Sequence, residues 1–139
     1  MAVLVGKLAK VTVGTVTISE IGTYSLSGFS RDALDSTSFG DDVKEYTFGL
    51  GDAGEVTFSG NYDSANTLGQ ERINSACENG SLFTGGDLKF YVDSTSYMTV
   101  DTGGTILITK CRAIGMDKAG LGSISFIGKV SGKKLVLLA

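Results

Sequence analysis

One run of glycines has the spacing of a phosphate-binding loop. Gly49, Gly51 and Gly54 form the pattern Gly-x-Gly-x-x-Gly in the stretch GLGDAG. Such a loop holds a pyrophosphate where it leads into the N-terminus of a helix, but here the residues that follow, EVTFSGNY at 55–62, alternate like a β-strand. The acidic residues within and just after the run would also repel phosphate. We therefore interpret these glycines as hairpin-turn residues.

A thiol between two cations is the second pattern that suggests chemistry. Cys111 lies between a lysine and an arginine, and neighbouring cations lower the pKa of a thiol. On a strand, however, Cys111 points away from both cations, onto the face of Leu107 and Ala113. Two cysteines are too few for a disulfide framework. We therefore expect Cys111 and Cys77 to be buried free thiols in a reducing compartment.

Other catalytic and metal-binding patterns are missing from the sequence. There is no histidine, which excludes His-based catalytic dyads, His-ligated zinc and haem on a proximal imidazole. Asp41, Asp42, Asp52 and Asp63 are potential calcium ligands, but no Asp-x-Asp-x-Asp-Gly loop is present. No nucleophile elbow or Ser-x-x-Lys motif occurs either. We expect a protein that is not an enzyme, with no catalytic site, no metal site and no cofactor.

The length and composition indicate one globular domain. The chain has 139 residues, 42% of them hydrophobic, with 20 glycines and no proline. This is enough to bury a core, and there is no Gly-X-Y repeat of the collagen type. No apolar run approaches the roughly 18 residues of a membrane span, and no signal peptide is visible. We expect a single domain over residues 1–139, with an N-terminal arm at 1–10 and no membrane association.

Alternating apolar and polar residues dominate the chain, which is typical of β-strands. We predict strands at 11–18, 20–28, 43–50, 55–62, 87–93, 97–101, 105–116 and 121–132, and a C-terminal edge segment at 132–139. In the strand at 55–62, Val56 and Phe58 are expected to face the core. The period changes over 64–79, which predicts one helix capped by Asp63 or Ser64 and ended by a glycine. The fold class is mainly β: a two-sheet β-sandwich or barrel with one flanking α-helix and a long inter-strand loop.

The long loop is residues 29–42, which show no strand or helix pattern of their own. Connections of this length inside a domain are usually functional or disordered. Large apolar side chains alternate there with acids, and such groups are costly in water unless they dock on something. We favour an interaction loop over a solvated one. Its candidate contact residues are Phe29, Arg31, Asp32, Leu34, Asp35, Phe39, Asp41 and Asp42.

Charge is distributed unevenly along the chain. The net charge of −3 divides into +2 for residues 1–19, −8 for 20–128 and +3 for 129–139. A pI near 4.8 argues against a surface that grips nucleic acid. The terminal cations are candidates for an acceptor of acidic groups: Lys7, Lys10, Lys129, Lys133 and Lys134. The absence of proline is consistent with strands whose edges pair with neighbouring subunits.

The stretch 21–63 resembles the tail tube (major tail) proteins of long-tailed bacteriophages. The likeness rests on a strand leading into Ser-Gly-Phe-Ser at 27–30, an Asp-rich segment with Thr-Ser-Phe-Gly at 37–40, and EYTFGL at 45–50. GEVTFSGNYD at 54–63 and a short helix follow. The order of elements over the rest of the chain fits as well. The tube proteins of type VI secretion share this architecture.

The resemblance implies a structural subunit of six-fold rings that stack into a hollow tube. Loop 29–42 would reach the neighbouring ring, and the tube would conduct DNA from capsid to host without binding it specifically. Partners would be further copies of the chain, a tape-measure protein, a tail terminator and distal tail proteins. The location would be the virion tail, after assembly in the host cytoplasm. Candidate lumen-facing residues are small, polar or acidic: Thr23, Ser25, Ser27, Glu45, Thr47, Glu55, Thr57 and Ser59.

Two other classes remain open at this stage. One is the tube protein of a related bacterial injection system, which has the same architecture. The other is a monomeric β-sandwich binding module or adhesin, which would expose aromatic residues on one face and not assemble. A hydrolase without a recognisable motif ranks third.

Overall fold

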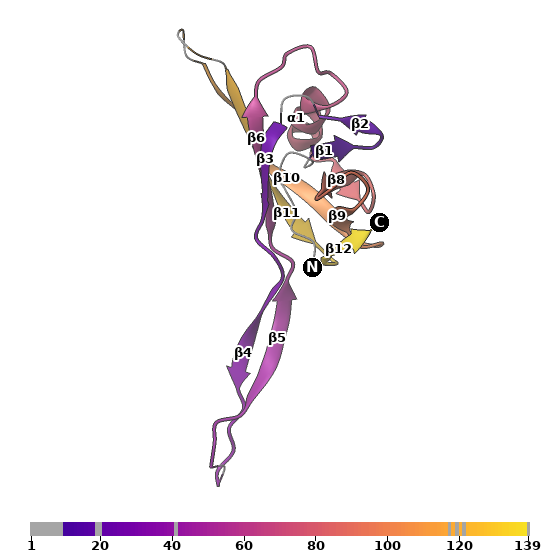
Figure 1. Ribbon diagram of the computed structural model, residues 1–139. Coiled ribbons are helices and arrows are strands. Elements are labelled where there is room, and N and C mark those ends of the chain that lie inside the picture. The colour runs from indigo at the N-terminus through magenta and orange to yellow at the C-terminus, as the bar shows by residue number, and fades with distance from the viewer. Residues whose placement is uncertain are drawn as a thin grey trace.

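The computed structural model describes residues 10–18, 21–40, 42–116, 118, 120 and 122–138, which form two packed sheets, one helix and a projecting hairpin (Figure 1). Both sheets of the sandwich have five strands. The one with the shorter strands, which we call the small sheet, has the order β12-β9-β8-β1-β2, and the other, the large sheet, has the order β3-β6-β11-β10-β7. The small sheet contains β1 (Lys10–Val13), β2 (Val16–Thr17), β8 (Leu88–Tyr91), β9 (Tyr97–Val100) and β12 (Leu135–Leu138). The large sheet contains β3 (Ile21–Leu26), β6 (Glu55–Asn61), β7 (Leu82–Thr84), β10 (Thr105–Gly115) and β11 (Ser123–Ser131). The predicted fold class is confirmed.

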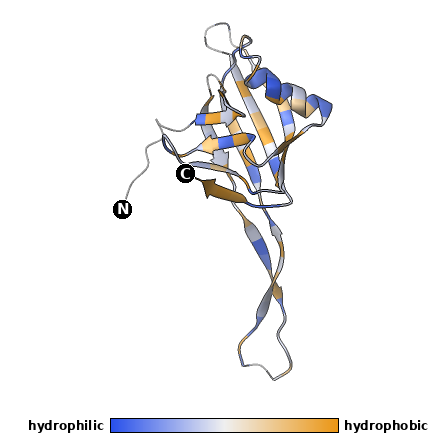
Figure 2. Ribbon diagram, turned by 90° about the vertical axis from the view of Figure 1, so that its right-hand side faces the viewer, coloured by the Kyte–Doolittle hydropathy of each residue, from blue (hydrophilic) through white to orange (hydrophobic). Residues whose placement is uncertain are grey.

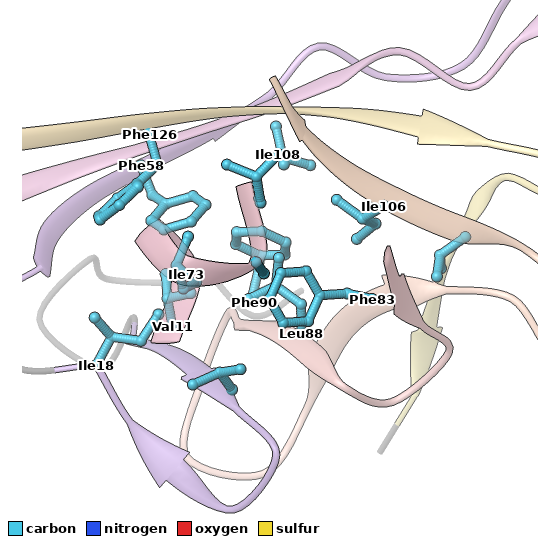
Figure 3. Packing of buried hydrophobic residues seen from close by; sticks show 14 of the residues in the cluster. Val11, Ile18, Phe58, Ile73, Phe83, Leu88, Phe90, Ile106, Ile108 and Phe126 are labelled. Carbon is cyan, nitrogen blue, oxygen red and sulfur yellow. The ribbon is translucent and has the colours of Figure 1, made fainter. Parts of the chain in front are cut away.

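The core lies between the two sheets, where alternate strand residues meet. Val56 and Phe58 of β6 are buried as the alternation predicts, and Phe126 of β11 stacks on Phe58 with ring centroids 5.0 Å apart. Phe90 of β8 crosses from the small sheet and meets Phe58 edge-on at 5.7 Å (Figure 3). These rings tie the two sheets together. On β6, the residues that alternate with this core face are polar: Glu55, Thr57 and Ser59.

A two-stranded hairpin, which we call the arm, projects from the sandwich (Figure 1). It consists of β4 (Ser30–Asp35) and β5 (Tyr46–Asp52), which pair antiparallel as a separate sheet. The expectation that residues 29–42 lack a strand is therefore wrong. Every residue of β4 is exposed, because no other described segment forms a second layer beneath the arm. Its sequence therefore shows no buried face.

The glycine run 49–54 is not a hairpin turn, contrary to the prediction. Gly49 and Gly51 lie within β5, and Gly54 stands where the arm bends into the large sheet. Gly54 has φ +89°, and a Cβ there would collide with the carbonyl oxygen of Gly28 on the facing strand. Glycine is needed at this bend because the two backbones approach too closely for a side chain.

The helix α1 (Gln70–Asn79) is shorter than the predicted 64–79. Asp63 accepts a hydrogen bond from the backbone of Ala65, and Asn66 accepts one from that of Gln70, so these polar residues form turns before the helix. The helix ends at Gly80 in the left-handed conformation, as expected.

Three further details differ from the expectations. Residues 11–18 form the β1–β2 hairpin around Gly14 and not one strand, and β7 was not predicted. Cys77 and Cys111 form a disulfide with Cα atoms 6.2 Å apart, so the expectation of free thiols is wrong.

The C-terminal segment forms β12 at an edge of the small sheet, as predicted. Among the described residues, no helix has the length and apolar character needed to cross a membrane.

Candidate assembly surfaces

The arm carries a stripe of exposed apolar side chains. Phe48 is 77% exposed and Leu50 97%, while Phe39 near the tip is fully exposed. Val43 and Tyr46 extend the stripe. Hydrophobic segments recur along the arm in Figure 2. Contiguous apolar surface of this kind on a soluble domain marks a contact with another molecule.

The tip of the arm is closed by a small hydrogen-bond network. Thr37 donates from its backbone N–H and its hydroxyl to the Asp35 carboxylate, at 2.9 and 2.6 Å. The Glu45 N–H donates to the Thr37 hydroxyl, and the Ser36 N–H donates to the Glu45 carbonyl. The bonds from Thr37 hold the pKa of Asp35 below its usual range. The tip therefore presents an ionised, oriented carboxylate.

The root of the arm is fixed by aromatic and backbone contacts. The Phe29 ring lies over Gly51, where a Cβ would collide with it. The Arg31 guanidinium lies 5.4 Å from the Phe29 ring centroid and 5.8 Å from that of Phe48. Ser27 and Glu55 exchange backbone and hydroxyl hydrogen bonds across the bend. These contacts set the direction in which the arm leaves the sandwich.

A groove of about 560 Å³ lies between the arm root and the turn that joins β11 to β12. Its cations are Arg31, Lys129, Lys133 and Lys134, and its one acid is Asp52. Asp52 pairs with Lys129 at 3.5 Å, and the Gly54 N–H together with Lys129 lowers its pKa. Phe29 and Ala53 supply apolar surface. The groove has an excess of positive charge and an aromatic wall.

The predicted basic acceptor set is only partly gathered. Lys129, Lys133 and Lys134 line the groove, at the end of the domain from which the arm projects. Lys10 lies in the small sheet, with its ammonium 4.5 Å from the Tyr91 ring centroid. Arg31 completes the groove, although the sequence analysis assigns it to the interaction loop 29–42. Lys7 and Asp41 lie outside the described residues.

Within the described part of the chain, one face of the large sheet has no covering layer; we call it the uncovered face. The small sheet and α1 both pack against the other face (Figure 1). Five of the predicted lumen residues share the uncovered face. Between β3 and β6, Thr23 lies opposite Ser59 and Ser25 opposite Thr57. Between β6 and β11, Glu55 lies opposite Lys129. The face continues onto β11 and β10 with Ser125, Ile127 and Lys110. It is a surface of small hydroxyls with few charges.

The other predicted lumen residues are elsewhere. Glu45 and Thr47 lie in the arm, and Ser27 lies at the bend, where its hydroxyl accepts the Glu55 N–H. The charges of the uncovered face are also not purely acidic, because Lys129 and Lys110 stand on it. The displacement of Glu45 follows from the long hairpin, which carries β5 beyond the sandwich.

A latch holds α1 to β10 and was not predicted. Arg112 has φ +51° at a bulge in β10, and its guanidinium binds Glu71 and Glu78 of the helix. Its backbone N–H donates to the Asn74 side chain at 2.9 Å. The hydrogen bonds from Arg112 lower the pKa of both glutamates, and those two carboxylates raise the pKa of Arg112. The adjacent disulfide completes the latch.

The described residues contain no group of three or more His, Cys, Asp or Glu side chains that could hold a metal ion. Of the four aspartates considered for calcium, the three that the structure describes are spread apart. Asp52 is at the arm root and Asp63 precedes α1, whereas Asp42 is in the arm tip.

No protein-family model and no curated protein sequence matches the chain. Solved structures do match over the whole length. A chain in the virion of a native gene transfer agent (GTA) particle has a TM-score of 0.73 at 17% identity, covering 99% of this chain and 100% of that chain. A chain in the tail of an empty GTA particle, computed with helical refinement and C6 symmetry, has a TM-score of 0.72 at 18% identity, with coverages of 99% and 100%.

A third match comes from the sheath/tube terminator of an extracellular contractile injection system in the extended state. Its TM-score is 0.72 at 13% identity, covering 100% of this chain and 99% of that chain. The class that these likenesses define is a fold: the chain has the fold of subunits found in phage-like tails and injection-system tubes. The predicted likeness to tail tube proteins is confirmed at the level of the fold.

Proposed function

We propose that the chain is the structural subunit of a phage tail tube. Six copies form a ring, rings stack into a hollow tube, and the tube conducts DNA from the capsid to the host. The observation that carries this proposal is the arm: a solvent-exposed ribbon with an apolar stripe has no partner among the residues that the structure describes. The whole-length likeness to a chain of a C6-symmetric tail supports the same arrangement.

In this proposal the uncovered face of the large sheet lines the lumen. Thr23, Ser25, Thr57 and Ser59 give that wall hydroxyl groups, and tight DNA binding needs clustered cations that release counterions. Lys129 is compensated by its ion pair with Asp52, which weakens its attraction for phosphate. DNA passes such a wall without specific binding. Tape-measure, terminator and distal tail proteins are the expected partners in a virion assembled in the host cytoplasm.

Negative-stain microscopy of the purified chain at rising concentration tests the assembly. We expect rings and then tubes, with a six-fold end view. A monodisperse monomer at high concentration would instead favour a β-sandwich binding module. A related injection-system tube is the second candidate, because the chain shares its fold with a subunit of an injection system's sheath/tube terminator.

Accessibility to a bulky maleimide tests the lumen wall. Both native cysteines are in the disulfide, so a single introduced cysteine is the reactive site. We expect Thr57→Cys to react in the free subunit and to be protected in tubes, whereas Lys89→Cys on the small sheet stays reactive in both. Equal labelling of Thr57→Cys before and after assembly would place the lumen elsewhere.

A further inference from the structure

The groove at the arm root and the tip of the arm are complementary in charge. The groove holds four cations against Asp52. The described part of the tip carries Asp35, Asp42 and Glu45 against the single cation Lys44. Two such surfaces on one molecule attract each other between copies, since they lie at opposite ends of the arm and cannot meet within one chain.

The two surfaces are also complementary in shape and polarity. Phe39 is a fully exposed phenyl ring at the tip. The groove has an aromatic wall in Phe29, which is 49% exposed, beside Ala53. Aromatic side chains that fill a well-packed, desolvated pocket often carry much of the energy of an interface.

The length of the arm fits a contact along a stack. Phe39 lies ten residues beyond Phe29, which is at most about 33 Å of extended strand. The strand β11 has 9 residues and spans about 30 Å, and it ends at the groove. An arm that enters a neighbouring subunit at the end opposite its groove therefore reaches the groove after running the height of the sheet.

We propose that the arm-root groove is the receptor for the arm tip of a second copy of this chain. Phe39 of one copy packs against Phe29 of the next, and Asp35 and Asp42 meet Lys133, Lys134 and Arg31. This inference rests on the proposed stacking of rings. Its consequence is that the arms join tip to root, so that they form continuous lines along the tube.

Site-specific photocrosslinking tests the contact in assembled tubes. A benzophenone amino acid replaces Phe39, the tubes are irradiated, and the crosslinked peptides are identified by mass spectrometry. We expect crosslinks to the groove segments 29–31 and 129–134 of another copy. Tubes whose crosslinks lie in other segments would overturn the tip-to-root contact and leave the proposed function standing. Failure of the unmodified chain to form tubes at any concentration would overturn both.

Charge reversal tests the electrostatic part. We expect Lys133→Glu with Lys134→Glu to raise the critical concentration for tube assembly at least about tenfold, and Asp35→Lys with Asp42→Lys to do the same. Combining the four changes should recover most of the loss. Lys10→Glu with Lys89→Glu, on the small sheet, is the matched control for net charge and should change assembly less than about twofold. An equal loss in that control, or no recovery in the combined variant, would overturn the contact.

Discussion

Removing the Cys77–Cys111 disulfide is expected to destabilise the subunit substantially. The bond closes a loop of 34 residues between α1 and β10. The chain-entropy model gives about 4 kcal/mol at 25 °C for a loop of this length. For a domain of this size each kcal/mol corresponds to about 3–4 °C in Tm, so the loss amounts to about 12–16 °C.

The helix depends on this bond because it buries little apolar surface. Its buried residues are Gln70, Ile73, Asn74 and Ala76, and two of these four are polar. The Arg112 latch remains when the disulfide is absent, so α1 should stay in place but open more often. Hydrogen exchange in α1 should therefore accelerate more than exchange in β6 and β11, which hold the aromatic core.

The assay is thermal unfolding followed by circular dichroism, with and without reductant. The variant Cys77→Ser with Cys111→Ser should unfold about 12–16 °C below the oxidised protein, and reductant should bring the natural chain to the same temperature. Reductant should have no effect on the double-serine variant, which is the control. A difference below about 2 °C between oxidised and reduced protein would refute the reasoning.

Three further outcomes follow from the packing and charges. Arg112 lowers the pKa values of Glu71 and Glu78 below 4.5 in the folded state. The stabilisation by these ion pairs is therefore present above pH 4.5 and is lost as the pH falls through the folded-state pKa values. Tm should fall more between pH 5 and 3 in the natural chain than in Arg112→Gln. Gly54→Ala should cost more than about 1 kcal/mol in urea unfolding, whereas Gly22→Ala, which meets nothing within 4 Å, should cost less. Phe58→Ala should cost about 3–5 kcal/mol, while Phe48→Ala should leave monomer stability nearly unchanged and weaken assembly in sedimentation assays; equal loss of stability in both would contradict the assignment of Phe48 to a contact surface.

The sequence predicted the sandwich because its strands bury one face. Val56 and Phe58 alternate with polar residues, and both are buried because the second sheet lies against their side of the strand. The same alternation at Tyr46 and Phe48 was equally clear, but no layer covers the arm. Periodicity records which residues share a face and does not record whether a core exists on that side.

The parts that could not be predicted depend on contacts between distant segments. The disulfide needs the β10 bulge at Arg112 to bring Cys111 under α1. The groove needs the β11–β12 turn to fold against the arm root, which unites Lys133 with Arg31 and leaves Lys10 on the other sheet. Charge counting along the chain separated basic termini from an acidic middle, but it could not show which members of each group meet.

Folding and assembly use different residues in this chain. The buried aromatic and aliphatic side chains all lie in the sandwich and α1, whereas the apolar stripe of the arm lies outside the core among the described residues. A two-stranded ribbon is marginally stable in water by itself, so the arm gains its stability from its root contacts at Phe29 and Arg31 and from whatever it binds. Substitutions in the stripe can therefore alter contacts between subunits without unfolding the subunit. This separation is what allows the arm to be long, apolar and exposed in a domain that remains folded.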